Sequence, residues 1–174
     1  MRQKSNARIY AFQFLYHLQC DGLIEGQEIP FNATPDKRKA YLEEYLSYFN
    51  TAIEDEEAPS EKCLRLALEL IDGVLAQHAV LEKMVEKYTG KWSIDKINKI
   101  DLTILLLATY ELNFYKETPA KVVIDEAIKL AKSFSEKSSY SFINGVLDSM
   151  SKASQASLKE ANGNHSESSS DTNS

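Results

Sequence analysis

The chain has 174 residues, of which 43% are hydrophobic, and a formal net charge of −6 at pH 7. This length suits one domain with a substantial core, and the most apolar segment, residues 102–108, is too short to cross a bilayer. Bulk positive charge is excluded as a means of binding nucleic acid, although residues 1–22 carry a local charge of +2 and residues 23–61 carry −7.

The amino-terminal residues and the two cysteines indicate a cytoplasmic protein. The first residues lack the apolar core of a signal peptide. Cys20 and Cys63 occupy unrelated helical positions, so reduced thiols are expected rather than a disulfide.

The first predicted helix covers residues 5–20 and ends before Asp21-Gly22. Its core-facing stripe recurs at helical spacing and consists of Ala7, Ala11, Phe14, Leu15 and Leu18. Arg8, Phe12 and Tyr16 form a second line on a neighbouring face. The pattern therefore predicts one packed face and one face open to other roles.

The next segment, residues 23–33, is predicted to be an irregular loop, followed by a helix over residues 34–57. Thr34-Pro35 has the form of a helix start. Tyr41, Tyr45 and Tyr48 flank the apolar stripe of this helix. They fit a core role, a self-association face or a cover over another surface equally well, so all three alternatives stay open.

Residues 61–90 have a clear helical period, either as one helix kinked near His78 or as two helices. Gly90 ends this region. Ser93 or Asp95 is expected to cap a further helix that runs to about residue 113 and is the most buried in the protein. Residues 113–117 form the link that follows.

Thr118-Pro119 reads as an N-cap and a first-turn proline, and the helix that follows has an apolar stripe ending at Phe134. Residues 135–139 break the pattern before a last helix. Its stripe is formed by Ile143, Val146, Leu147 and Met150. Tyr140, Phe142 and Asn144 fall off that stripe, which makes them candidates for binding rather than packing.

After residue 152 the chain turns to Ser, Asn, Gly and Asp, which cannot bury a core. We therefore expect a helical domain over residues 1–152 and a disordered Ser/Asn-rich tail over residues 153–174. With no strand pattern elsewhere, the fold class is all-α, with about seven helices.

Catalytic and metal-binding patterns are absent, so no enzyme activity, cofactor or metal is expected. The chain has no glycine-rich phosphate loop, no H-E-x-x-H and no C-x-x-C motif. The three histidines are isolated. Asp125 and Glu126 are adjacent on a helix and so point about 100° apart, which favours a solvated face over a shared site.

Binding of single-stranded RNA requires cations for phosphates, aromatic faces for bases and polar groups for base edges. Arg2, Lys4 and Arg8 supply cations at the start of the first helix. Tyr140 and Phe142 offer aromatic faces, and Asn144 or Ser138 offers polar groups. The alternatives are a solvated basic end and a phenylalanine in the core.

Three blocks of sequence, in the same order, resemble the NusB-type transcription antitermination family. They are A-R-I-Y-A-F-Q-F-L-Y at residues 7–16, I-D-L-T-I-L-L-L-A-T-Y-E-L at residues 100–112, and the carboxy-terminal pair P-A-K-V-V-I-D-E-A-I-K-L-A-K-S-F and F-I-N-G-V-L at residues 119–134 and 142–147. These blocks are specific and cover about half of the chain. Residues 22–60 are longer than is usual in the family.

The resemblance implies two packed three-helix subdomains and a bacterial, non-catalytic factor that supports ribosomal RNA transcription. Such a factor holds boxA-like RNA together with the ribosomal protein NusE, and contacts other Nus factors and RNA polymerase indirectly. Carried over by position, the implied RNA-binding residues are Lys4, Ser5, Arg8, Ser138, Tyr140, Phe142 and Asn144. The arginine-rich start of the family is thinned here, which predicts weaker RNA binding without NusE.

The resemblance also assigns Tyr16 and Asp101 to the NusE surface. A tyrosine offers stacking area and an aspartate can pair with an arginine, although packing for Tyr16 and a helix-start charge for Asp101 are the alternatives. Homodimer formation stays open. The rival functions are a protein-interaction adapter that has lost RNA binding and an accessory to an RNA methyltransferase.

Overall fold

A computed structural model describes residues 2–20, 36, 39–40, 43–45, 59–90, 92–115 and 117–163. Within these ranges the chain forms five α-helices and one short 3-10 helix, residues 36, 39–40 and 43–45 are helical as well, and none of the described residues is in a strand. The elements are α1 (Arg2–Cys20), α3 (Glu61–Tyr88), η2 (Ile94–Lys96), α4 (Lys99–Asn113), α5 (Ala120–Phe134) and α6 (Ser139–Gly163). The all-α class is confirmed, whereas the predicted loop over residues 23–33 and most of the predicted helix over residues 34–57 lie outside the described residues.

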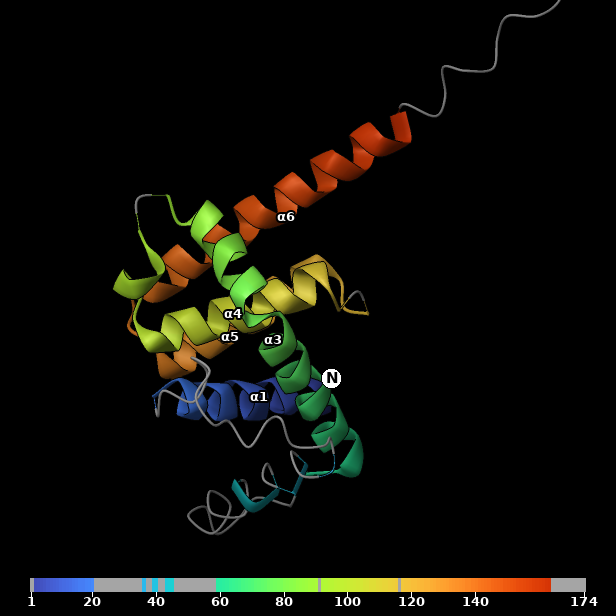
Figure 1. The fold of residues 1–174 in the computed structure, drawn as a ribbon, viewed down its shortest axis with the longest axis vertical. Coiled ribbons are helices and arrows are strands. Elements are labelled where there is room, and N and C mark those ends of the chain that lie inside the picture. Colours follow the sequence, from blue (N-terminus) through green and yellow to red (C-terminus); the bar gives the residue numbers. More distant parts are fainter. Residues whose placement is uncertain are drawn as a thin grey trace, which may run out of the picture.

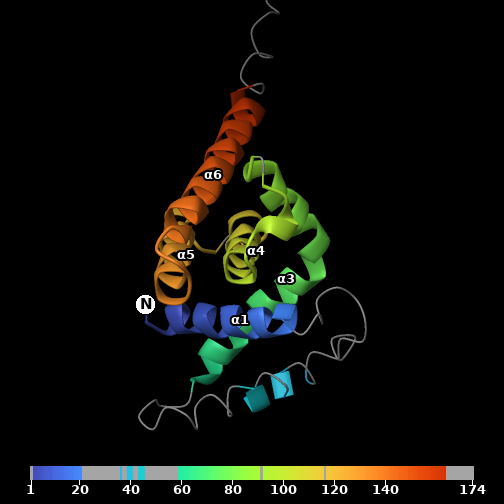
Figure 2. The same ribbon diagram turned by 90° about the vertical axis from the view of Figure 1, so that its left-hand side faces the viewer.

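Helix α4 lies at the centre of the molecule, with α1, α3 and α5 around it (Figure 2). Every residue from Leu102 to Thr109 is buried, as predicted for the most buried helix. A helix that is apolar on all sides is stable only when other elements cover it on all sides. This surrounding explains why α4 has almost no polar face.

Helix α1 lies beside α5, and the two run in the same direction. Ser5 contacts Glu126 near the start of the pair, and Phe12 contacts Phe134 further along. The predicted stripe of α1 is buried as expected: Ala7, Ala11, Phe14, Leu15 and Leu18. Arg8 and Phe12 are buried as well, because α1 packs against α3, α4 and α5 rather than against one neighbour.

Three helix boundaries differ from the sequence prediction or decide an open alternative. Residues 61–88 form the single helix α3. Helix α4 is capped by Asn98, whose side-chain oxygen accepts from the backbone N–H of Asp101 at 2.8 Å, and not by Ser93 or Asp95. Helix α5 begins after Pro119, which takes the N-cap position predicted for Thr118.

Helix α6 runs on through Gly163, past residue 153, where the sequence predicts that the tail begins. Its last part projects away from the other helices (Figure 1). Extending an existing helix is easy because each added residue gains one hydrogen bond, and Ala153, Ala156 and Leu158 are good helix formers. A helix therefore replaces the first part of the predicted tail. None of the described helices is long and apolar enough to cross a membrane.

Candidate functional site

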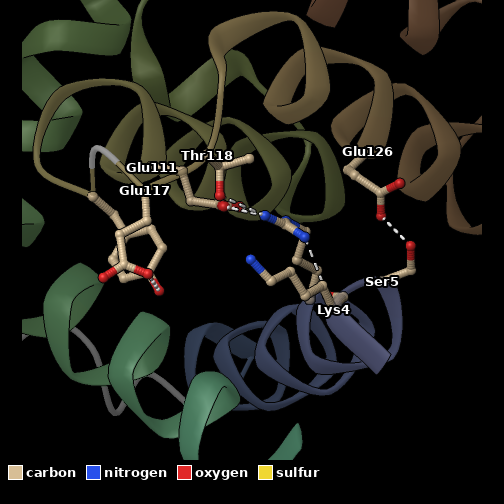
Figure 3. Close-up of polar contacts among 8 residues, drawn as sticks. Lys4, Ser5, Glu111, Glu117, Thr118 and Glu126 are labelled. Atoms are coloured by element: carbon tan, nitrogen blue, oxygen red, sulfur yellow. Dashed lines mark hydrogen bonds and ion pairs between the residues drawn. The ribbon is translucent and has the colours of Figure 1, made fainter. Parts of the chain in front are cut away.

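Arg8, expected on the RNA-binding surface, forms a buried ion pair with Glu111 of α4. Its Nε donates to Glu111 Oε1 at 2.8 Å and its Nη2 donates to Oε2 at 2.5 Å, with both side chains at most 4% exposed. Nη1 also donates to the backbone oxygen of Lys4, and Nη2 donates to Thr118 Oγ1, each at 3.2 Å. Figure 3 shows Glu111 and Thr118 beside this end of α1.

This pairing corrects the interpretation of Arg8 as a cation that contacts phosphate. Burial opposes its charge, but the hydrogen bond and proximity of Glu111 outweigh burial and raise the pKa of the guanidinium above its ordinary value. The charge is thus already balanced by a carboxylate inside the protein. Of the basic residues at this end whose side chains are described, Lys4 is the exposed one.

Ser5, also expected to contact RNA, is half-buried and bonded to α5. Its hydroxyl donates to Glu126 Oε2 at 2.6 Å (Figure 3), and Lys129 Nζ donates to Oε1 of the same carboxylate at 2.6 Å. Burial on its own raises the pKa of Glu126, but these two hydrogen bonds outweigh burial and hold that pKa below its ordinary value of 4.5. Glu126 therefore belongs to the α1–α5 contact and not to the solvated face expected for it.

Acidification is expected to weaken the α1–α5 contact through Glu126. Because its folded-state pKa lies below the unfolded value, its stabilising effect is complete above about pH 4.5 and is lost as the pH falls through the lower, folded value. In urea unfolding, the stability difference between wild type and Glu126→Gln should be largest at pH 7 and shrink below about pH 4.5. A difference that stays constant with pH would contradict this, and Asp125→Asn on the exposed neighbour is the control.

Further along α1, three aromatic rings form a continuous line from α1 to the end of α5. The rings of Tyr16 and Phe12 are stacked with centroids 6.1 Å apart, and the ring of Phe12 lies 4.9 Å from that of Phe134. Tyr16 is half-buried, and Phe134 is 37% exposed. Tyr16 thus packs against a neighbouring ring and still presents part of its surface to solvent.

Asp101, the second expected partner residue, is only 4% exposed. Its Oδ1 accepts from Ser135 Oγ at 2.5 Å and its Oδ2 accepts from Asn98 Nδ2 at 2.7 Å. The interpretation of Asp101 as an open carboxylate for a partner's arginine is therefore corrected. The carboxylate holds the start of α4 and the end of α5 together.

The remaining expected RNA residues lie on the connection between α5 and α6 and at the start of α6. Ser138, Tyr140 and Asn144 are exposed, Tyr140 by 41%, and Phe142 is half-buried. The ammonium of Lys132 lies 5.7 Å from the centre of the Tyr140 ring, a cation–π arrangement. This surface offers a cation, an aromatic face and polar groups within one short stretch.

The structure separates the expected RNA residues into two groups. Ser5 lies beside Glu126 in the middle of α5, and Lys4 precedes it on α1, whereas Ser138 and Tyr140 follow Phe134 at the C-terminal end of α5. Glu126 and Phe134 are eight residues apart, which corresponds to about 12 Å of α5 between the level of Ser5 and the end of the helix.

Sequence reasoning missed four residues of this region: Lys132, Phe134 as an exposed ring, Ser135 and Glu111. The sequence did offer a way to find Glu111, because a carboxylate in an otherwise apolar helix is expected to pair with a partner group. Ser135 carried none, since a serine at a helix end is common. The described residues contain no group of three or more His, Cys, Asp or Glu side chains that could hold a metal ion.

Of the three tyrosines at residues 41, 45 and 48, the structure describes Tyr45, whose side chain packs against α1. Its ring meets Phe14 edge-on at 5.4 Å and stacks on His17 at 5.2 Å, and its hydroxyl donates to the backbone oxygen of Gln13 at 3.3 Å. Of the three alternatives for this segment, a cover over α1 fits Tyr45. Tyr41 and Tyr48 lie outside the described residues.

Comparison with known proteins adds a family. Residues 5–152 match the model of the NusB family. The transcription antitermination protein NusB of Oleidesulfovibrio alaskensis is 33% identical over 153 residues, which cover 88% of this chain and 90% of that protein.

Comparison with solved structures also finds NusB chains with a similar fold. T. maritima NusB has a TM-score of 0.66 and 28% identity, with 86% of this chain and 90% of that chain covered. A chain in a crystal structure of antitermination factors NusB and NusE in complex with dsRNA has a TM-score of 0.69 and 24% identity, with 88% and 98% covered. At that identity the second likeness shows the fold alone.

Proposed function

This chain belongs to the NusB family, and we propose that it is a transcription antitermination factor that binds boxA-like RNA together with NusE. It works in the cytoplasm by binding alone, without a cofactor or a reaction of its own. It contacts other Nus factors and RNA polymerase indirectly, through its complex with NusE and RNA. Its relatives carry the antitermination name, and a protein of the same fold has been crystallised with NusE and RNA.

The surface around Tyr140 is the observation that supports RNA binding best. An exposed aromatic ring, a lysine beside it and exposed polar residues at Ser138 and Asn144 are the groups that single-stranded RNA requires. Lys4 extends the same role to the start of α1. Since Arg8 is paired internally, it adds no phosphate contact to those available from the exposed Lys4 and Lys132, which predicts a shallower dependence of RNA affinity on salt than a free Arg8 would give.

The NusE surface is proposed to include Tyr16, whose ring lies at the end of the aromatic line on α1. A half-exposed tyrosine offers stacking area and a hydroxyl to a partner. Phe134, exposed by 37% and next to Phe12, extends this apolar area. Asp101 takes part as the buried group beneath this surface.

Titration of a labelled boxA-like RNA and a scrambled control, with and without NusE, at two salt concentrations, tests the proposal. Wild type should prefer the boxA-like RNA and bind it more tightly when NusE is present. Equal, feeble binding of both RNAs in the presence of NusE would overturn the RNA role. Because Arg8 is unavailable as a surface cation, that outcome would favour the rival adapter function.

Tyr140→Ala is expected to weaken RNA binding by about fivefold to tenfold, the effect of losing one stacked base. NusE affinity should stay unchanged, because Tyr140 is at the start of α6 and is not one of the aromatic rings of Tyr16, Phe12 and Phe134 proposed for the NusE surface. Fluorescence anisotropy measures both affinities. Tyr140→Phe keeps the ring and should bind RNA like wild type, so a loss in the phenylalanine variant would argue against stacking.

A further inference from the structure

Tyr16 and Asp101, the two residues expected at the partner surface, are each connected by contacts to one of two consecutive residues at the end of α5, Phe134 and Ser135. Tyr16 reaches Phe134 through the ring of Phe12. Asp101 reaches Ser135 directly, through the hydrogen bond from the serine hydroxyl. Two different helices, α1 and α4, therefore hold the same point of the chain.

Ser135 is the point where α5 ends and the chain turns toward the RNA residues. Its backbone is extended, with φ −114° and ψ −179°, and its N–H closes the last turn of α5 on the oxygen of Ala131. Ser138 and Tyr140 follow within five residues. The direction in which Ser135 is held thus sets where those side chains lie.

A hydrogen bond between the side chains of Ser135 and Asp101 ties this connection to α4. The acceptor is a carboxylate oxygen of Asp101, which is 4% exposed, so water has little access to compete for this hydrogen bond. The other oxygen of Asp101 is held by Asn98, which itself caps α4. Asp101 therefore cannot move without disturbing either the cap of α4 or Ser135.

We propose that Ser135 is a positioning residue that couples NusE binding to RNA binding through its hydrogen bond with Asp101. The inference rests on the proposed function. A partner that docks over Tyr16 also covers the end of α5, where Phe134 is 37% exposed and Ser135 is half-buried, and so restricts the motion that residues 134 and 135 retain. RNA then binds a connection that is already ordered and loses less conformational entropy, which makes the two ligands tighten each other's binding reciprocally.

The coupling factor, which is the RNA dissociation constant without NusE divided by that with saturating NusE, is the quantity to measure. A variant that is merely less stable lowers both affinities, whereas the ratio changes only when communication between the surfaces changes. We expect a factor of at least about fivefold for wild type and below about twofold for Ser135→Ala. Ser135→Thr keeps a hydroxyl donor and should restore the wild-type factor.

Ser133→Ala is the matched control, since it makes the same chemical change at an exposed serine in the last turn of α5. Circular dichroism checks that each variant is folded. If alanine at residue 135 disturbs the fold, Ser135→Cys tests the same bond, because a thiol of similar size is a weak donor.

A coupling factor that is the same in Ser135→Ala or Ser135→Cys as in wild type would overturn the inference and leave the proposed function standing. Failure of wild type itself to bind RNA or NusE would overturn the proposed function and the coupling together. A factor that falls at residue 135 and not at residue 133 supports the inference.

Discussion

Arg8→Ala is expected to lower the free energy of unfolding by about 3–5 kcal/mol, because it leaves the carboxylate of Glu111 buried and unpaired. Glu111 is 2% exposed and accepts two hydrogen bonds from the guanidinium. The hydroxyl of Thr118 also loses its donor. Urea unfolding of wild type and variant at pH 7 measures the loss.

The double variant Arg8→Met/Glu111→Leu is the matched control for this effect. Replacing both members of a buried ion pair by apolar side chains of similar volume is often neutral or stabilising, so the double variant should recover most of the stability. It should also bind RNA like wild type, with the same salt dependence. A restored fold with weakened RNA binding would instead show that Arg8 contacts phosphate, against the structure's placement of this residue.

Gly73→Ala is expected to destabilise the protein by about 1–3 kcal/mol, although alanine favours a helix interior by about 1 kcal/mol. A Cβ at residue 73 of α3 would lie 1.9 Å from Cζ of Tyr110 on α4. The ring cannot swing away without giving up its stack on Phe114, at 5.9 Å between centroids. The absence of a side chain at residue 73 is therefore what lets the ring of Tyr110 pack against α3.

Gly145→Ala in α6 makes the same change where a Cβ meets nothing within 4 Å. It should stabilise the protein by about 0.5–1 kcal/mol. In Gly73→Ala/Tyr110→Ala the clash is absent, so the two stability losses should be far from additive. Additive losses, or opposite signs at the two glycines from those expected, would contradict the role of close packing at residue 73.

The sequence determined the helices and the faces on which they pack. The stripe of α1 through Ala7, Ala11 and Leu15 is buried as its spacing predicts, and the apolar run of α4 is the centre of the molecule. These predictions were possible because helical periodicity is local, so a few residues suffice to define a face. For the same reason Tyr140, Phe142 and Asn144, which fall off the stripe of α6, were predicted to serve a role other than packing. Tyr140 and Asn144 are exposed, whereas Phe142 is half-buried against the core.

Helix ends were less well determined. Asn98 rather than Ser93 or Asp95 caps α4, and α6 continues through residues 153–163, which were predicted to be disordered. Several polar residues near a helix start have similar capping ability. Which of them becomes the cap depends on where the rest of the chain allows the helix to begin.

Only the tertiary structure decided what the polar residues of the site do. In the sequence, Arg8 has the spacing of a surface cation, yet its partner Glu111 is 103 positions away. Asp101 and Ser135 are 34 positions apart and are joined by a hydrogen bond between different helices. Periodicity shows which residues of a helix are polar, but a polar residue can face solvent or a partner on another helix. The packing of α1, α4 and α5 decides which of the two occurs, because a charge buried in their interface destabilises the protein unless an opposite charge or a hydrogen-bonding group pairs with it.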